Sequence, residues 1–286
     1  MRYTLVFPSS LFPLPSSLLP APCSLLPAPC SLKPRDLYLM GIRLAISNQQ
    51  VTLNNGVGAG LKFHGDGSNP DFARGTYELP LQKALASCLN HDHIFYDIGA
   101  NIGFFTIIAA KLVGPYGQVY AFEPVPNNAD IILRNVELNS FSNVTVFPQA
   151  VSESTGTGEL LLAHHSGGAT LATAGTPPDL RGEMTVDLVS IDDLVSQKTL
   201  KPPTVVKIDV EGAEINVLRG MLQTIKEYQP ILIYEVDDGN QESFKLKNQS
   251  IEMFINSLGY KIMPLEPAYP NIPWYVGHAI AFSNLN

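Results

Sequence analysis

Cysteine is scarce in this sequence, and its scarcity limits the kinds of site that the chain can form. The three cysteines, Cys23, Cys30 and Cys88, form no CxxC pair and no cluster with histidine at zinc-ligand spacing. We therefore expect neither a disulfide framework nor a dedicated metal site. Cys88 lies in an apolar run, as an inert core thiol would, and this pattern fits a reducing, cytoplasmic compartment.

Positive charge is also in short supply. The chain carries 18 Lys and Arg against 26 Asp and Glu, which gives a net charge of −8, and the basic residues form no block. Binding to nucleic acid or to an anionic membrane surface requires clustered positive charge, so we expect no nucleic-acid partner. The most apolar stretch lies at the N-terminus and is repeatedly broken by proline, so no integral membrane segment is predicted.

Residues 1–39 form a low-complexity segment of Leu, Ser, Pro, Ala and Cys. The heptapeptide Ser17–Cys23 is repeated without change as Ser24–Cys30, and its prolines exclude a helix. A signal peptide is one interpretation, although Arg2 is the only early positive residue, and a lipoprotein-type cysteine is a second. An identical repeat is more typical of translated repetitive DNA. We therefore predict a disordered extension or an untranslated segment, with Met40 as an internal start.

From Ile94 onward, short β-branched or aromatic runs alternate with amphipathic helical stretches, which is typical of crossover units and a parallel sheet. Apolar faces predict helices around Ala129–Val136, Ile215–Ile225 and Ile251–Leu258, and the stretch 103–113 is apolar almost all round. The expected strands are 94–98, 118–122, 144–147, 205–208, 231–236, 261–265 and 275–282.

This alternation predicts an α/β chain with one main domain. We expect residues 94–286 to form that domain and residues 40–93 to pack against its sheet as an N-terminal cap. An insertion at about 152–203, rich in Gly, Thr and Ser, separates the third and fourth strands, and connections of this length are usually functional or disordered. Its end, Thr185–Ile191, alternates apolar and polar residues and predicts an extra strand.

A loop with two glycines follows the first predicted strand. In an open parallel sheet the ligand crevice lies beyond the carboxyl ends of the strands, so a cofactor should bind at this loop. Gly99 and Gly103 let the backbone approach a ligand closely, and Ala100 and Asn101 lie between them. Asp97, at the strand end, is placed to accept hydrogen bonds from loop amides or from a ligand.

Glu123 ends the second strand, where a carboxylate can accept hydrogen bonds from both ribose hydroxyls of a nucleoside cofactor. The competing interpretation is a dinucleotide dehydrogenase, whose fingerprint is GxGxxG, whereas this loop has the spacing GxxxG. A pyrophosphate needs more bare backbone than this loop offers. We therefore predict a nucleoside cofactor without a phosphate, and an ordinary strand and glycine turn is the non-functional alternative.

Six segments together resemble the FkbM family of class I S-adenosylmethionine-dependent methyltransferases, over roughly Tyr77–Tyr234. The run Lys207–Glu214 is the most diagnostic of them. The resemblance implies S-adenosylmethionine as cofactor and a Rossmann-like seven-stranded methyltransferase sheet, mostly parallel with an antiparallel last strand and with helices on both faces. It also implies methylation of a hydroxyl on a sugar, glycolipid, polysaccharide or glycosylated natural product. The matching segments are 97–103, 119–124, 150–152, 189–194, 207–214 and 218–220.

Asp209 and Glu211 follow the fourth strand and should face the crevice. An enzyme that methylates an alcohol must align the hydroxyl and remove its proton. Three interpretations compete: either acid is the general base, both hold a divalent cation such as Mg²⁺, or Glu211 only caps the helix beginning near Gly212. We expect a catalytic or substrate-orienting role for Asp209 and leave Glu211 open between these roles. Lys207 is expected to form a structural ion pair.

His165 is a further candidate base, because imidazole titrates near neutral pH and this residue lies in the insertion that should close over the site. His164 and His278 qualify by residue type alone. Glu78 and Glu235, the latter at the end of the fifth strand, are also expected to reach the crevice, and we assign Glu78 to the cofactor side. Solvent exposure is the non-functional alternative for Glu78, and a buried structural pair is the alternative for Glu235.

Two other functions remain open at this point. One is an N-methyltransferase or a methyltransferase for a protein side chain, because an amine acceptor needs less base catalysis. The other is a non-catalytic nucleoside-binding module that has the same fold.

Overall fold

The computed structural model describes residues 50–65, 69–163, 168–177, 179–269 and 274–284. The N-terminal repeat, the proposed start at Met40 and the candidate bases His164 and His165 lie outside the described residues. Within the described ranges, no helix has both the length and the apolar character needed to cross a membrane.

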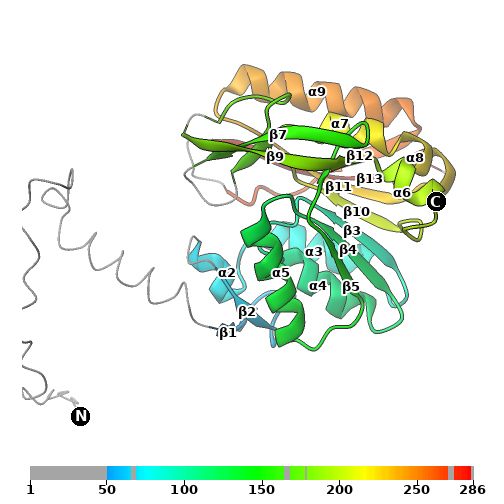
Figure 1. The fold of residues 1–286 in the computed structure, drawn as a ribbon. Helices are drawn as coiled ribbons and strands as arrows, with labels where there is room; N and C mark the ends of the chain where they lie inside the picture. The colour runs from blue at the N-terminus through cyan, green and yellow to red at the C-terminus, as the bar shows by residue number, and fades with distance from the viewer. Residues whose placement is uncertain (1–49, 66–68, 164–167, 178, 270–273, 285–286) are drawn as a thin grey trace, which may run out of the picture. The chain divides into compact units, whose positions relative to one another are not determined.

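The main sheet has seven strands in the order β12-β13-β11-β10-β3-β4-β5 (Figure 1). Its central strands pair in parallel, and β13 runs antiparallel to both of its neighbours. This arrangement confirms the predicted fold class, including the antiparallel last strand. The strands are β3 (Ile94–Ile98), β4 (Gln118–Phe122), β5 (Val144–Phe147), β10 (Val205–Ile208), β11 (Ile231–Asp238), β12 (Tyr260–Pro264) and β13 (Tyr275–Ser283).

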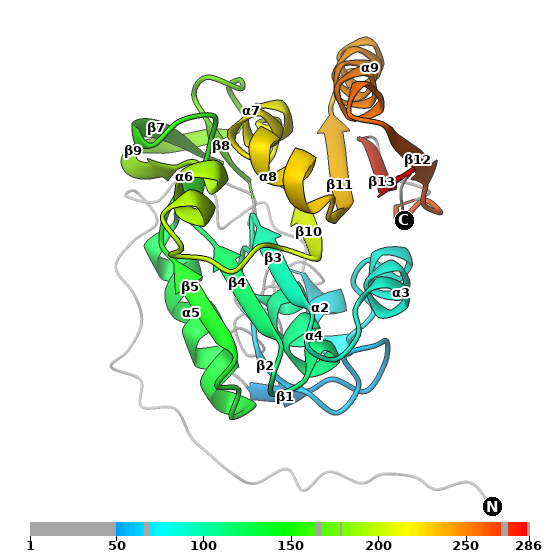
Figure 2. The ribbon, with the colours of Figure 1, turned by 90° about the vertical axis from the view of Figure 1, so that its right-hand side faces the viewer.

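Both faces of the sheet are covered, because its strand residues alternate between two apolar cores. Phe95 and Val205 belong to one core, whereas their neighbours Tyr96 and Val206 belong to the other. Figures 1 and 2 show the first face covered by α3 (Leu79–Cys88), α4 (Phe104–Val113) and α5 (Pro126–Leu138). The opposite face is covered by α7 (Glu214–Gly220), α8 (Leu222–Tyr228) and α9 (Gln241–Ser257).

The described residues before β3 pack on the face that carries α4 and α5. They form an antiparallel hairpin of β1 (Gln50–Thr52) and β2 (Lys62–His64), followed by α2 (Pro70–Arg74) and α3. Asn135 of α5 accepts a hydrogen bond from the His64 amide at 2.7 Å and donates one to the His64 carbonyl at 3.0 Å. The hairpin is thus tied to a helix of the main domain, as a cap would be.

The long insertion folds into a second sheet with the order β6-β9-β7-β8. It contains β7 (Gly156–Ala163), β8 (Ala169–Leu171) and β9 (Leu180–Val189), and its edge strand β6 (Ala150–Val151) lies just before it; α6 (Ile191–Ser196) follows. The predicted extra strand corresponds to β9. Leu160 and Leu171 of this sheet pack with Ala213, which follows the fourth parallel strand β10. The insertion therefore covers the edge of the main sheet where the strands end.

Candidate active site

The loop between β3 and α4 has a left-handed backbone that requires glycine at one position in particular. Gly99, Asn101 and Gly103 have φ values of 79°, 49° and 81°. A Cβ atom on Gly99 would lie 1.7 Å from the carbonyl oxygen of Asp209. Gly99 therefore lets the first and fourth strand ends approach each other, while Ala100 is buried in a small core between the loop and α5.

Asp97 lies fully buried beneath this loop and belongs to a network of charges. Its Oδ2 accepts a hydrogen bond from Thr106 Oγ1 at 2.6 Å. Lys207 Nζ lies 3.3 Å from Asp97 Oδ1 and 3.1 Å from Asp209 Oδ2, and it donates to the Gly99 carbonyl at 3.1 Å. The expected ion pair of Lys207 is thus present, and it ties the two strand ends and the loop together.

Burial and ion pairing act in opposite directions on this network. Burial raises the pKa of Asp97, although the nearby Lys207 ammonium opposes the shift. Burial alone would lower the pKa of Lys207, but the Asp209 and Asp97 carboxylates raise it. Lys207 therefore keeps its charge at neutral pH and compensates both aspartates.

Glu123 ends β4 and is buried beside the same loop. Its Oε2 accepts a hydrogen bond from the Asn101 amide at 2.9 Å, and its Oε1 accepts one from the Val125 amide at 2.9 Å. Burial raises the pKa of Glu123 to about 7, although these amides favour the carboxylate. Oε1 also accepts a long hydrogen bond from Asn128 Nδ2 at 3.4 Å. Oε2 therefore keeps a free lone pair for one hydroxyl donor, and a second hydroxyl can reach Oε1 by replacing the Asn128 contact.

One cavity brings half of the predicted site residues together. It encloses about 950 Å³, including its open mouth, and Gly99, Asn101, Glu123, Asp209 and Glu211 all line it. The second sheet contributes apolar side chains to the same lining. The cavity has the size of a small-molecule site, with polar groups from the ends of β3, β4 and β10 and an apolar cover.

Glu211 lines the cavity and does not cap the next helix. Its φ of 54° is followed by a φ of 100° at Gly212, and its side chain also lines two neighbouring cavities. The hydrogen bond at the start of α7 is instead made by Glu214, whose Oε1 accepts from the Gly212 amide at 2.9 Å. Burial, together with the charges of Asp237 and Asp209, raises the pKa of Glu211.

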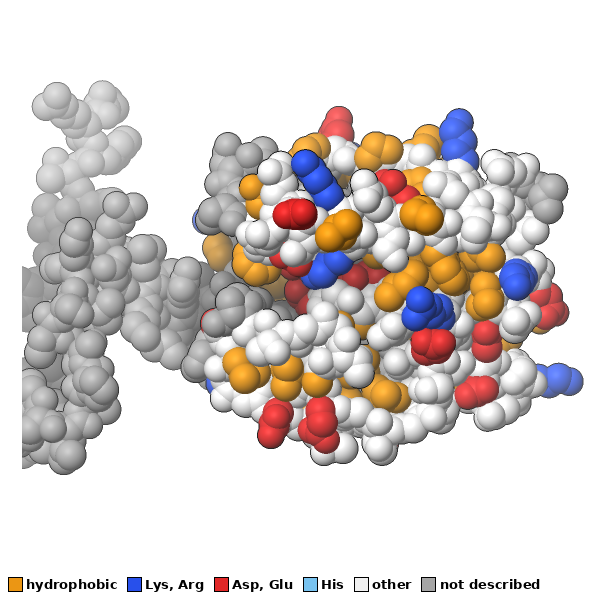
Figure 3. All heavy atoms as spheres, turned by 90° about the horizontal axis from the view of Figure 1, so that it is seen from above, with side chains coloured by type: hydrophobic (Ala, Val, Ile, Leu, Met, Phe, Trp, Pro, Cys, Tyr) orange, Lys and Arg blue, Asp and Glu red, His pale blue; other side chains and the backbone are white. Residues whose placement is uncertain are grey.

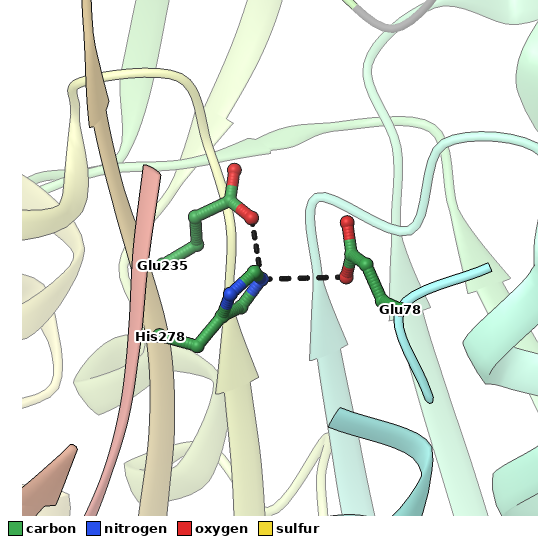
Figure 4. Close-up of side chains that lie close together, drawn as sticks. All are labelled: Glu78, Glu235 and His278. Atoms are coloured by element: carbon green, nitrogen blue, oxygen red, sulfur yellow. Dashed lines mark ion pairs between the residues drawn. The ribbon is translucent and has the colours of Figure 1, made fainter. Parts of the chain in front are cut away.

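A second group of charged side chains lies beside the cavity and consists of Glu78, Glu235 and His278 (Figure 4). Glu78 Oε1 accepts a hydrogen bond from the Tyr269 hydroxyl at 2.5 Å. His278 Nε2 lies 2.5 Å from Glu235 Oε2 and 3.4 Å from Glu78 Oε2. Glu78 is buried and lines the neighbouring cavity with Glu235 and Tyr269 rather than the cavity of the cofactor loop. Its assignment to the cofactor stays a prediction.

The sequence did not predict two aromatic residues, Tyr269 and Trp274, of the neighbouring cavity that Glu78 and Glu235 line. Trp274 Nε1 donates to Asp237 Oδ2 at 2.7 Å, and both residues line cavities that also include Glu211. Asp237 lies near the carboxyl end of β11, where the ligand crevice of such a sheet is expected, so its position in the sequence could have identified it. Trp274 and Tyr269 belong to the connection before β13 and carry no such signal.

Basic side chains form no patch on the face of the molecule shown in Figure 3, where Lys and Arg lie scattered singly among other residues. Near the cavities, Lys207 and Lys247 are each engaged by aspartates, the latter with Asp238 at 2.9 Å.

Comparison with known proteins gives relatives among methyltransferases. The hexuronic acid methyltransferase AglP of Haloferax volcanii is 30% identical over 157 residues, which cover 54% of this chain and 61% of that protein. Methyltransferase 1 of Beauveria bassiana is 30% identical over 152 residues, which cover 46% of this chain and 59% of that protein. The chain thus spans about three fifths of the length of these relatives.

A solved structure of an FkbM methyltransferase from Methylobacillus flagellatus is 21% identical, with a TM-score of 0.45, and the match covers 66% of this chain and 43% of that one. A sequence model described as the methyltransferase FkbM domain matches residues 97–262, from the end of β3 into β12. This range is more than half of the chain and contains both the cofactor loop and the run Lys207–Glu214. The chain belongs to the FkbM methyltransferase family.

Proposed function

We propose that this protein is an S-adenosylmethionine-dependent O-methyltransferase that acts on a hydroxyl of a sugar or of a glycosylated compound. The observation that carries this proposal is the cavity that Gly99, Asn101 and Glu123 line together with Asp209 and Glu211. A nucleoside donor and an acceptor can meet in such a space. The family membership and the hexuronic acid methyltransferase among its relatives support the same reaction.

At the donor end, Glu123 would accept hydrogen bonds from the ribose hydroxyls, and the loop from Gly99 to Gly103 would contact the rest of the nucleoside through backbone groups. Asp97 would contact other protein groups and not the cofactor, because its carboxylate already contacts Thr106 and Lys207. Asp97 would therefore hold the loop in shape.

At the acceptor end, the reaction is an in-line displacement. The acceptor oxygen forms a bond to the methyl carbon, the bond from that carbon to the sulfonium sulfur breaks, and the hydroxyl proton passes to a carboxylate. Asp209 would orient the hydroxyl and receive this proton, since it lines the cavity and is still 23% exposed in its side chain. Glu211 would be a second hydrogen-bond acceptor for the sugar.

Calorimetry with S-adenosylhomocysteine tests the donor site. We expect one binding site per chain in the wild type and at least a tenfold loss of affinity in Glu123→Ala, which removes the ribose acceptor. Glu153→Ala is the matched control, because it removes an exposed acid that pairs with Arg219 and does not line the cavity, and it should bind like the wild type. If the folded wild-type protein does not bind S-adenosylhomocysteine, or binds NADH in preference to it, the proposal is wrong.

Transfer of a labelled methyl group from S-adenosylmethionine into an extract of the native host, followed by mass analysis, tests the acceptor. We expect label in a glycan or glycosylated product. Asp209→Asn should lower turnover by about 10²-fold to 10⁴-fold, the usual contribution of a general base, without changing affinity for S-adenosylhomocysteine.

An N-methyltransferase is the second candidate, because the surroundings of the acceptor carry an excess of acids. Glu211, Asp237 and Asp238 line one cavity, and Lys247 is the basic residue in that lining. Such a site also suits a protonated amine. Undiminished turnover by Asp209→Asn, with the label found on nitrogen, would favour this candidate over the proposed one.

A further inference from the structure

The cluster of Glu78, Glu235 and His278 is assembled from three separate elements. Glu78 immediately precedes α3, Glu235 belongs to β11 and His278 belongs to β13. Their side chains are buried, with exposed fractions of 2%, 14% and 2%. One oxygen from each glutamate and one ring nitrogen all lie within 4.8 Å of one another, and Figure 4 shows the three side chains pointing toward a common centre.

The three converging atoms are close to one another but are not satisfied by hydrogen bonds. Glu78 Oε2, Glu235 Oε2 and His278 Nε2 are all buried, and none makes a hydrogen bond of acceptable geometry with any group in the described part of the chain. Buried polar atoms in proteins normally have such partners. The contacts of these atoms are with one another, and they are ion pairs when the imidazole is protonated. With the imidazole neutral, the same three atoms converge on one point as the ligands of a cation do.

The charge around the cluster favours a cation as well. The two carboxylates face a single imidazole, and three further acids, Asp209, Glu211 and Asp237, line the two cavities that Glu235 also lines. A divalent cation at the centre would offset this negative charge.

The backbone at Glu78 points to a ligand role for its side chain. Glu78 occupies the cap position of α3 with a φ of 43°, a left-handed conformation that is unfavourable for a residue other than glycine. Its carboxylate makes no capping hydrogen bond to α3. The side chain is instead turned toward His278 and Tyr269, and the Tyr269 hydroxyl fixes the oxygen that does not face the imidazole.

We propose that Glu78, Glu235 and His278 bind one divalent transition-metal ion. Two carboxylate oxygens and one imidazole nitrogen suit Mn²⁺ or Zn²⁺ better than Mg²⁺ or Ca²⁺, which prefer oxygen ligands alone. Glu78 and His278 lie outside residues 97–262, the range of the family match, so the proposal depends on the structure of this chain.

The position of the ion gives it a role at the acceptor. Glu235 lines both the cofactor cavity and the neighbouring cavity, and three protein ligands leave coordination positions open. The ion would bind the acceptor hydroxyl, lower its pKa and ease its deprotonation. This consequence rests on the proposed methyl transfer, whereas metal binding itself does not.

The test is a titration of the full, chelator-treated protein with Mn²⁺ alone, without S-adenosylmethionine, in which electron paramagnetic resonance measures the free ion. We expect saturation at one Mn²⁺ per chain and displacement by Zn²⁺. Glu78→Gln, Glu235→Gln and His278→Gln should each weaken binding at least about tenfold. Asp237→Asn is the matched control, because it removes an acid from the same cavity but not from the cluster, and it should bind Mn²⁺ like the wild type.

Two results would overturn the metal site. One is the lack of saturable Mn²⁺ binding by the wild type, which does not depend on the folding of any variant. The other is equal weakening in all four variants, which would indicate diffuse attraction by the acidic region. Binding of S-adenosylhomocysteine, measured on the same samples, checks that the variants are folded. It also separates the two proposals, because a protein that binds Mn²⁺ but not S-adenosylhomocysteine would contradict only the proposed function.

Discussion

The two parts of the proposed active site are built in different ways. We call Asp97, Gly99, Asn101, Glu123 and Lys207 the cofactor end, and we call the residues in and beside the neighbouring cavity, Glu78, Glu211, Glu235, Asp237 and His278, the acceptor end. At the cofactor end the charges are compensated, since Lys207 lies between Asp97 and Asp209. At the acceptor end acids predominate, and the pKa values of Glu211, Glu235 and Asp237 are all raised, first of all by burial.

This difference indicates that the cofactor end stabilises the folded protein, whereas the acceptor end destabilises it until a ligand binds. A compensated, hydrogen-bonded network holds its shape without a ligand, and removing one member leaves a buried charge unpaired. A surplus of like charge is a cost to the folded protein that a bound cation or acceptor can offset. The cofactor end should therefore respond to mutation as part of the scaffold, and the acceptor end as a binding site.

The largest expected effect is that of Lys207→Met. It removes the shared cation and leaves Asp97 and Asp209 without their ion-pair partner, so the free energy of unfolding should fall by about 3–5 kcal/mol. Lys247→Met is the matched change at the acceptor end, where the pair with Asp238 is partly exposed, and it should cost only about 0–1 kcal/mol. Urea denaturation measures both. Equal losses of unfolding free energy in the two variants would contradict the proposed difference between the two ends.

A smaller effect is expected from Gly99→Ala when it is compared with Gly60→Ala. Both glycines have positive φ, at 79° and 89°, but the new Cβ would collide with the Asp209 carbonyl only at position 99 and has nothing within 4 Å at position 60. The backbone strain is thus similar in the two variants. Gly99→Ala should be less stable than Gly60→Ala by about 1–3 kcal/mol, the usual cost of overpacking, in the same denaturation assay.

The cofactor end should also show a pH dependence of ligand affinity. The pKa of Glu123 is raised to about 7 by burial, and only the carboxylate accepts hydrogen bonds from both ribose hydroxyls. Affinity for S-adenosylhomocysteine should therefore be full above pH 7 and fall as the pH drops below it. The expected loss is about tenfold between pH 8 and pH 6, which corresponds to one proton.

Glu123→Gln is the control for this pH dependence. It should bind more weakly at pH 8 and show a flat profile, because the amide does not titrate. A profile that keeps its slope in the variant would assign the titration to another group.

The sequence predicts the parts of the site whose residues are close together in the chain better than the parts whose residues are far apart in it. The strands at 94–98, 118–122 and 205–208 were predicted with the observed bounds, because each is a short β-branched or aromatic run between polar segments. The loop 99–103 is a local motif at the end of such a strand, so its place in the fold could be predicted, whereas its binding of the cofactor stays a prediction. In the insertion, β7 was missed because it begins with Gly-Thr-Gly and continues as an apolar run, without alternation.

The acceptor end depends on contacts that no local pattern contains. The hydrogen bond from Tyr269 to Glu78 joins residues 191 positions apart. Glu78 was selected as a candidate near the crevice, and His278 by residue type, but their convergence with Glu235 requires the antiparallel pairing of β11 and β13, which places Glu235 opposite His278. Pairing of this kind is fixed by the tertiary structure, and the signal available in advance was only the position of acids near strand ends.

The smallest expected effect is a gain of stability in Glu211→Gln, and it has the opposite sign to the loss in Lys207→Met. Burial raises the pKa of Glu211 above its usual value, so its ionised form destabilises the folded state. This penalty is absent below about pH 4.5, where the carboxyl is protonated in both states, and it grows as the pH rises toward the folded pKa. The variant should therefore match the wild type at pH 4 and be more stable by about 0.5–2 kcal/mol at pH 8, in parallel urea denaturations. Glu153→Gln, at an exposed acid, should show no such difference between the two pH values. A loss of stability in Glu211→Gln at pH 8 would mean that Glu211 belongs to the scaffold, and the contrast between the two ends would then fail.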